Sequence, residues 1–152
     1  MKPLEFKPLQ KEAWQEINNH PLIRKWVRDD FGSVEINKGW LYLGVEDKGY
    51  VAIEPLNHIC YSLHIALLPE LWGRGKEVGM AAGWWCFNNT ICQKLQVIVP
   101  EYNRLAIKIS RDCGLELEGV MKKSFAKGFK LHDQVIYGIT KRSAICQQQQ
   151  QQ

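Results

Sequence analysis

The chain has 152 residues, of which 45% are hydrophobic and 24% charged, a composition typical of one globular domain. Its formal net charge of +4 is a mild basic excess without the clustered basic residues of a nucleic-acid binder, so no nucleic-acid partner is expected. No apolar run approaches the ~18 residues of a transmembrane helix, and the first residues lack the apolar core of a signal peptide. We therefore expect a cytoplasmic protein without membrane contact.

The five cysteines form an odd count and contain no Cys-x-x-Cys pair, so neither a disulfide framework nor a zinc site is indicated. Reduced thiols and no bound metal are expected. Residues 147–152 are all glutamine, a low-complexity run that does not require packed structure. We expect a single domain over residues 1–142, followed by a tail at 143–152 that frays.

Hydrophobic periodicity predicts a strand, two helices and three strands in the first half of the chain, at residues 4–8, 11–19, 22–29, 40–45, 50–55 and 58–68. Pro21 separates the two helices, because proline cannot continue a helix interior. A loop is expected at 31–33. The sequence Asp47-Lys48-Gly49 has the residue types of a hairpin turn.

The second half is expected to form a helix, a strand, a helix and two strands, at residues 76–88, 95–99, 102–113, 115–125 and 134–140. Gly114 stands where a helix is commonly closed by glycine. A basic loop at 127–130 separates the last two strands. The predicted order is β-αα-βββ-α-β-α-ββ, an α/β fold of the mixed α+β kind with no internal repeat.

The turn Gly73-Arg74-Gly75 joins an apolar strand to a helix and is the most informative local feature. Backbone amides are unpaired at the start of a helix, and glycines allow a ligand to approach the chain closely. Such a turn is a natural seat for phosphate groups.

The order of elements and three stretches of sequence resemble the GNAT superfamily of N-acetyltransferases. Residues 69–75, Pro-Glu-Leu-Trp-Gly-Arg-Gly, resemble the acetyl-CoA loop of that family. Residues 103–106, Asn-Arg-Leu-Ala, with Cys-Gly-Leu at 113–115, resemble its next motif, and residues 116–120 with Asp133, Tyr137 and Gly138 resemble its closing segment. The resemblance covers nearly the whole chain and implies a central, mixed, mostly antiparallel sheet flanked by helices.

The resemblance also implies acetyl-CoA as co-substrate. The amides of residues 73–78 would bind its pyrophosphate, Arg74 and Lys76 would add positive charge, and the backbone near residue 67 would hold the pantetheine arm. Asn103 matches a position that orients the cofactor or acetyl group. The implied cofactor-binding residues are Leu67, Leu68, Trp72, Gly73, Arg74, Gly75, Lys76, Val78 and Asn103.

The chain departs from the family pattern at two positions of this loop. Trp72 stands where arginine or glutamine is usual, and Glu77 stands where glycine or alanine is usual. A carboxylate beside a pyrophosphate is repulsive by ~1 kcal/mol or more. If the Glu77 side chain turns outward, cofactor binding is retained; otherwise the affinity for acetyl-CoA falls.

Acetyl transfer to an amine needs a base, and His64 is the candidate in this chain. Strand alternation places His58, Cys60, Ser62, His64 and Ala66 on one face. The glutamate that serves as base in many family members aligns with Ser62. A structural histidine with a satisfied hydrogen bond is the alternative interpretation of His64.

The tyrosine that serves as acid in the family aligns with Ser110. A serine hydroxyl is a poor acid but can relay a proton or hydrogen-bond the thiolate, whereas an ordinary helix serine is the alternative. Tyr102 and Tyr137 are other candidate phenols. Asp29, Asp30 and Glu35 form an acidic cluster that would attract an amine or simply lie in solvent.

Two functions remain open from the sequence. The first is a cytoplasmic, acetyl-CoA-dependent N-acetyltransferase whose acceptor is the primary amine of a small molecule or of a protein N-terminus. The second is a GNAT-fold binding or assembly factor without turnover, such as a phage-encoded virion assembly protein. The final strands could pair in a homodimer.

Overall fold

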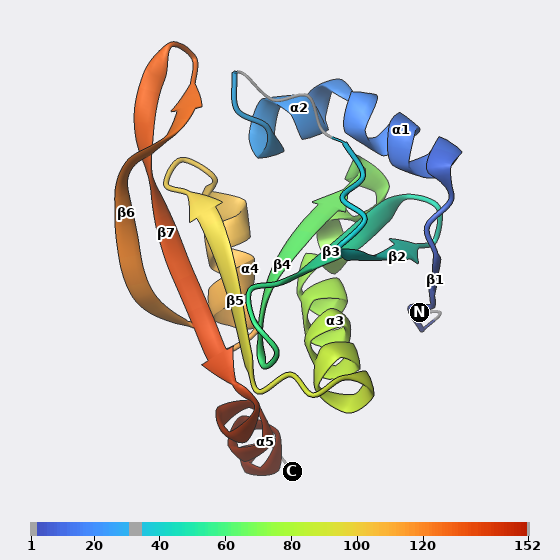
Figure 1. The fold of residues 1–152 in the computed structure, drawn as a ribbon, viewed down its shortest axis with the longest axis vertical. Helices are drawn as coiled ribbons and strands as arrows, with labels where there is room; N and C mark the ends of the chain where they lie inside the picture. Colours follow the sequence, from blue (N-terminus) through green and yellow to red (C-terminus); the bar gives the residue numbers. More distant parts are fainter. Residues whose placement is uncertain (1–2, 31–34, 152) are drawn as a thin grey trace.

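The protein is described from a computed structural model that covers residues 3–30 and 35–151. The loop predicted at 31–33 lies outside the described residues. One sheet has the strand order β1-β2-β3-β4-β5-β7-β6 (Figure 1). Its strands are β1 (Phe6–Pro8), β2 (Leu41–Val45), β3 (Gly49–Pro55), β4 (Cys60–Leu67), β5 (Lys94–Pro100), β6 (Glu116–Lys127) and β7 (Lys130–Thr140).

The helices are α1 (Lys11–Asn19), α2 (Pro21–Val27), α3 (Gly75–Asn89), α4 (Arg104–Asp112) and α5 (Lys141–Gln150), with the 3-10 helix η1 (Pro69–Arg74) before α3. The predicted fold class and the predicted order of the eleven elements are confirmed. Most boundaries differ from the prediction by one to four residues, as expected for element ends. The two additions are η1 and α5, which the hydrophobic pattern does not indicate.

The sheet carries a hydrophobic core on each face. The larger core packs α3 against β4 and β5 through residues such as Val78, Leu63 and Leu95. The smaller core packs α1 and α2 against the opposite face and includes Ile17 of α1 and Ala66 of β4. The predicted alternation of β4 is therefore confirmed, because its odd-numbered apolar residues face α3 and its even-numbered residues face α1 and α2.

The strands β4 and β5 are the only parallel neighbours in the described part of the sheet, and they separate along their length. They pair from Cys60 with Lys94 to Ser62 with Gln96 and no further. Figure 1 shows the two arrows moving apart beyond this point. Each strand keeps its antiparallel partner on the outer side, β3 for β4 and β7 for β5. The sheet is consequently split open at its centre.

The glutamine run is folded, which differs from the expectation of a fraying tail. Thr140 caps α5 by accepting a hydrogen bond from the Ser143 amide. Ala144 packs on the larger core, and the Gln147 side-chain amide donates to the Gly114 carbonyl at 3.0 Å. Glutamine is a good helix former, and a capped helix that continues from β7 needs few contacts to hold it. The composition of the run shows that it is polar, but it does not predict the cap at Thr140 or the contacts of Ala144 and Gln147.

We predict that Gln147→Ala lowers the melting temperature by about 2–4 °C, because one part-buried hydrogen bond of about 1 kcal/mol is lost. Gln149→Ala is the matched control, since this exposed residue lies on the same helix and gains the same helix propensity. Thermal unfolding followed by circular dichroism measures the difference. Equal melting temperatures for the two variants would show that Gln147 does not anchor α5.

Candidate active site between the two diverging strands

A cleft of about 700 Å³ occupies the gap between β4 and β5. Its walls come from both strands, from α2 and α4, and from the hairpin of β6 and β7. Six residues of the predicted site line this one cleft: His64, Leu67, Trp72, Gly75, Asn103 and Ser110. The fold thus brings together candidates that are up to 46 positions apart in the sequence, from His64 to Ser110.

The cleft exposes two strand edges that have no strand partner within the described residues. On β4 the edge runs beyond Ser62, and on β5 it runs beyond Gln96. Backbone amides and carbonyls at such an edge require hydrogen-bond partners. An extended ligand with amide groups can supply them by lying between the strands as a further strand.

His64 on β4 contacts a carboxylate on the neighbouring strand. Its Nε2 atom lies 2.7 Å from Oε2 of Glu54, which is near the end of β3. The imidazole also stacks on the Trp40 ring, with 4.8 Å between the centroids and 6° between the planes. When Nε2 donates to Glu54, the lone pair on Nδ1 is free to accept a proton. The stacking and the carboxylate together fix the orientation of the ring.

Glu54 is a residue of the candidate site that the sequence reasoning missed. In the β3–β4 register Glu54 lies directly opposite Ser62, and Ala52 lies opposite His64. A carboxylate of the adjacent strand therefore lies across from Ser62, the position at which the family resemblance places a glutamate. Pairing the predicted strands 50–55 and 58–68 outward from the turn between them would have placed Glu54 close to His64.

The predicted phosphate loop is wound into η1 and the first turn of α3. A Cβ atom added at Gly73 would meet no atom within 4 Å, so neither packing nor backbone conformation requires glycine there. At Gly75 the same atom would come 2.5 Å from the Ile109 side chain, so this glycine allows α3 and α4 to pack closely. Leu68 and Val78 are buried in the core, which leaves only their backbone atoms for a ligand.

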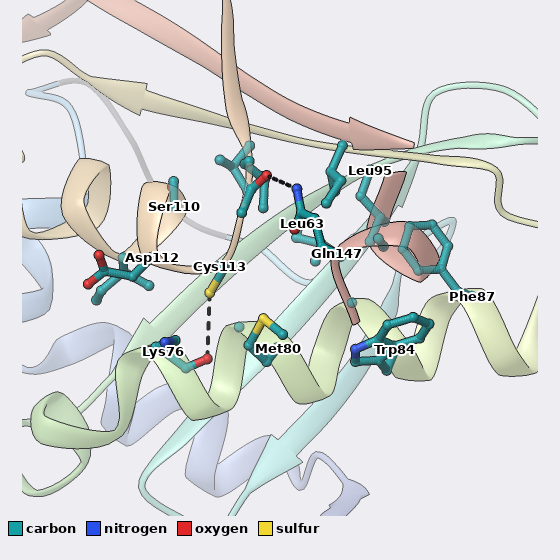
Figure 2. A pocket seen from close by; sticks show the side chains of 18 of the residues that line it. Leu63, Lys76, Met80, Trp84, Phe87, Leu95, Ser110, Asp112, Cys113 and Gln147 are labelled. Carbon is teal, nitrogen blue, oxygen red and sulfur yellow. Dashed lines mark hydrogen bonds between the residues drawn. The ribbon is translucent and has the colours of Figure 1, made fainter. Parts of the chain in front are cut away.

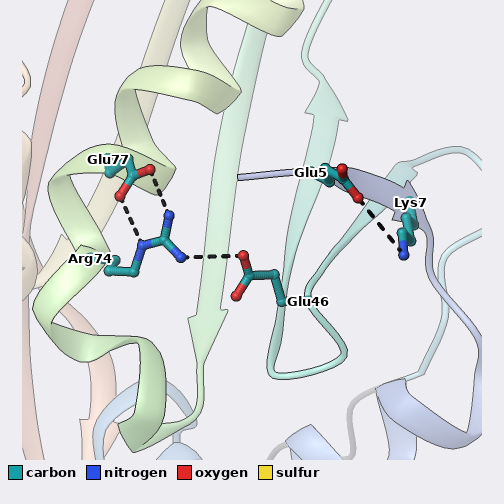
Figure 3. Close-up of polar contacts among 5 residues, drawn as sticks. All are labelled: Glu5, Lys7, Glu46, Arg74 and Glu77. Carbon is teal, nitrogen blue, oxygen red and sulfur yellow. Dashed lines mark hydrogen bonds and ion pairs between the residues drawn. The ribbon is translucent and has the colours of Figure 1, made fainter. Parts of the chain in front are cut away.

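Arg74 is held by two carboxylates (Figure 3). It donates to Glu77 through Nε at 2.8 Å and Nη2 at 2.7 Å, and Nη1 lies 3.2 Å from Glu46 in the turn between β2 and β3. The hydrogen bonds from Arg74 lower the pKa of the Glu77 carboxyl. The guanidinium that the family resemblance assigns to the phosphates is therefore paired with two carboxylates, one of which is the Glu77 that departs from the family pattern.

Trp72 has a hydrogen-bonding role in the loop. Its indole Nε1 donates to the Leu67 carbonyl at 2.9 Å, at the end of β4. The ring remains 36% exposed and lines the cleft. The indole thus satisfies one acceptor at the end of the open strand.

Asn103 and Ser110 both make local hydrogen bonds on α4. Asn103 caps the helix by accepting from the Ala106 amide at 3.2 Å, and its own amide donates to the Trp26 carbonyl at 3.4 Å. The Ser110 hydroxyl donates to the Ala106 carbonyl at 2.8 Å. Both side chains line the cleft while these bonds hold them in place.

Neither candidate phenol presents its hydroxyl to the cleft. The Tyr102 ring lines the cleft, but its oxygen is buried and makes no hydrogen bond within the described residues. Desolvation by burial raises the pKa of this phenol, followed in size by the charges of Asp30 and Asp29. The Tyr137 hydroxyl accepts from Arg111 Nε at 3.1 Å.

A second cavity of about 250 Å³ lies on the α3 side of the sheet, with α5 on its wall (Figure 2). Lys76 and Cys113 line it, and the Cys113 thiol donates to the Lys76 carbonyl at 3.5 Å. Burial raises the pKa of this thiol, so it is protonated and a poor nucleophile. The residues common to this cavity and the cleft are Leu63, Ile65, Val97, Ile109 and Ser110, so the two spaces adjoin where the strands part.

The hairpin tip of β6 and β7 is tied to the chain after α2. Lys127 Nζ donates to the carbonyls of Arg24 and Arg28, at 2.7 Å each. The Asp30 carboxylate accepts from the amides of Gly128 and Phe129 at 3.2 and 3.1 Å. Of the predicted acidic cluster, Asp30 thus has a structural role, Glu35 is exposed, and none of the three lines the cleft.

Two further features bear on the class of site. Within residues 3–30 and 35–151, no three His, Cys, Asp or Glu side chains are grouped so as to hold a metal ion. The helices in this part of the chain are too short or too polar to cross a membrane.

No protein-family model matches the sequence, and no curated protein matches it. Among solved structures, the spermidine N-acetyltransferase from Vibrio cholerae, in complex with CoA and spermine, is similar with a TM-score of 0.80 at 18% identity, over 93% of this chain and 98% of that one. A chimera of this enzyme with hSSAT matches with a TM-score of 0.80 at 17% identity, over 95% and 99% of the two chains.

A protein provisionally described as a phosphinothricin N-acetyltransferase has a TM-score of 0.75 at 15% identity, over 90% of this chain and 98% of that one. The matches extend over nearly the full length of both chains in each case. At identities this low, the structural similarity establishes the fold and nothing further. The chain has the fold of the GNAT acetyltransferases.

Proposed function

We propose that the protein is an acetyl-CoA-dependent N-acetyltransferase that passes an acetyl group directly to a primary amine. The observation that carries the proposal is the position of the His64–Glu54 pair, in a cleft formed by two open strand edges beside a glycine-containing helix start. A paired histidine that is 40% exposed is available to take a proton.

The residues present fit acetyl-CoA. The open space at Gly73 leaves room for a phosphate close to the backbone at the start of α3. The edges of β4 and β5 offer hydrogen bonds to the amides of a pantetheine arm. Lys76 is exposed at the first turn of the helix and adds positive charge. Leu67 and Trp72 line the wall near this end, and Asn103 lines the same cleft.

Bound acetyl-CoA supplies the acetyl group as a thioester, and the protein supplies the base and the orientation. His64 accepts the proton that the amine nitrogen loses as its bond to the acetyl carbon forms and the carbon–sulfur bond breaks. Glu54 acts through His64: it holds the ring and stabilises the imidazolium that results. No acyl-enzyme is needed, because the amine attacks the thioester directly.

The departing thiolate needs little help. A thiol of this kind has a pKa near ~8.5, so its anion is a good leaving group at neutral pH. Ser110 is the side chain that we assign to contact or relay a proton to this sulfur. Its hydroxyl hydrogen must first leave the Ala106 carbonyl, which is 2.8 Å away.

The similar Vibrio cholerae enzyme is a spermidine N-acetyltransferase that holds CoA and spermine, which supports an amine acceptor in the present fold. We place the reaction in the cytoplasm, in keeping with five free cysteines. A protein N-terminus as acceptor, a homodimer through the β6 edge and a phage source are retained as hypotheses.

We predict that acetyl-CoA stabilises the protein on binding. At about 100 times its dissociation constant it should add about 2.7 kcal/mol, or a rise of about 5–10 °C in melting temperature. Differential scanning fluorimetry measures the shift. ATP is the control ligand, because it carries phosphates but lacks the pantetheine arm, and a smaller shift is expected.

The absence of a shift at millimolar acetyl-CoA would contradict the proposed enzyme. The remaining function would then be that of a GNAT-fold binding or assembly factor without turnover. The two carboxylates on Arg74 would explain that result, because they make the loop repulsive to phosphate.

We predict that Glu77→Gln tightens acetyl-CoA binding about fivefold. The substitution removes a negative charge beside the loop and makes Arg74 more available to a phosphate. Isothermal titration calorimetry at low salt measures the dissociation constant. Glu5→Gln is the matched control, because Glu5 is an exposed carboxylate that pairs with Lys7 outside the loop. Weaker binding by the Glu77 variant would show that the Arg74–Glu77 pair builds the loop.

We predict that His64→Ala lowers kcat by about 100-fold or more, because the reaction loses its base. Glu54→Gln should lower kcat by about tenfold through its effect on His64. The KM for acetyl-CoA should stay unchanged in both variants, and the melting temperature should fall by about 2–4 °C in each, because the His64–Glu54 hydrogen bond is lost or weakened. The measurement is release of the CoA thiol under saturating substrates.

The control for this series is His58→Ala, which removes an exposed histidine that precedes β4 and lies outside the cleft. It should retain the full rate. A His64→Ala variant with the rate of the unmodified protein would remove His64 from the mechanism, and a rise in KM alone would assign it to binding.

A further inference from the structure

The end of the cleft beside α2 and the β6–β7 hairpin is walled by apolar and aromatic side chains. We call it the aromatic pocket and define it by Leu22, Ile23, Trp26, Tyr102, Met121 and Phe125, all of which line the cleft. The Tyr102 ring lies 6.3 Å from Trp26 and 6.2 Å from Phe125, between centroids. Rings at these separations form a continuous apolar wall.

The cleft contains no carboxylate among the described residues that line it. Its charged lining side chain is Arg104, and the imidazole of His64 also lines it. Glu54 does not line the cleft but contacts His64, which does, at 2.7 Å. A ligand with several positive charges would therefore lose hydration of each charge on binding, and it would not find a carboxylate in the lining to pair with each one.

Asp29 and Asp30, two acidic residues in the chain segment that follows α2, are already engaged. Both oxygens of the Asp30 carboxylate accept backbone amides of the hairpin tip, and Asp29 also has an interaction partner. The same contacts, with those of Lys127, fix the hairpin against α2. The aromatic wall is thus held in place, and its carboxylate neighbours are used for that purpose.

We propose that the acceptor is a primary monoamine carried on an aromatic or similarly flat apolar body, and that polyamines are poor acceptors. This inference rests on the proposed function and names its substrate class. A monoamine brings one charge, and it loses the corresponding proton before it attacks. Its apolar body gains from burial against Trp26 and Phe125. The further ammonium groups of a polyamine would remain charged and unpaired beside Arg104.

The test compares 2-phenylethylamine with spermidine, because each presents a primary amine on a short methylene chain. Binding is measured by calorimetry with the full-length protein, in the presence of saturating CoA. We expect 2-phenylethylamine to bind at least tenfold more tightly, and its kcat/KM with acetyl-CoA to be at least tenfold higher. Affinities within threefold of each other, tighter spermidine binding, or no binding of either amine would overturn the proposal.

A single substitution tests the charge argument directly. Gln134→Glu introduces a carboxylate of the same size into the lining of the cleft. It should improve spermidine binding by about fivefold or more and leave 2-phenylethylamine binding within about threefold. Gln93→Glu is the matched control, because Gln93 is exposed and does not line the cleft. Equal effects of the two variants on spermidine would overturn the argument from charge.

Failure of this inference can be distinguished from failure of the proposed function. If CoA does not bind, the proposed acetyltransferase is excluded, and the same comparison of amines without CoA still decides whether the pocket prefers an aromatic monoamine. If CoA binds and acetyl transfer occurs with spermidine preferred, the enzyme stands and the aromatic acceptor is excluded.

Discussion

The separation of β4 from β5 is the constraint on which the site depends. The two strands are hydrogen-bonded as far as Ser62 and Gln96, and beyond these residues each retains only its outer antiparallel neighbour. A continuous sheet would have satisfied the inner edges and closed the centre of the molecule. Because the edges are left open, the cleft and the second cavity adjoin through the sheet. His64 reaches this space from β4.

Carboxylates around the site act through other side chains or backbone groups. Glu54 holds His64, Glu46 and Glu77 hold Arg74, and Asp30 holds the hairpin tip. None of them lines the cleft. The result is a cleft with little negative charge of its own, surrounded by acidic groups that position its components. This arrangement favours a nucleophile that arrives with a single charge and an apolar body.

Helix ends and turns fix the parts of the site relative to one another. Asn103 caps α4 and also donates to the Trp26 carbonyl, so the start of α4 is joined to the end of α2. The close contact of Gly75 with Ile109 joins α3 to the same helix. On the far side, Gln147 joins α5 to the turn at Gly114. Each of these contacts joins two elements that flank the split sheet. Together they hold β4 and β5 apart at a fixed separation where no hydrogen bonds join the two strands.

The sequence by itself determined the order of elements, the bounds of α1, the two faces of β4 and the glycine cap at Gly114, which has φ of 86°. These features follow from local periodicity and backbone preference. The turn at 73–75 came from its local residues, and the family resemblance added its acetyl-CoA assignment and the need for a base, for which strand alternation offered His64. Only the tertiary structure decided the partners of these residues. Glu54 and His64 are 10 positions apart, Arg74 and Glu46 are 28, and Gln147 and Gly114 are 33. Periodicity shows which face of a strand is buried, but strand register and the point where two strands part determine which side chains meet across it.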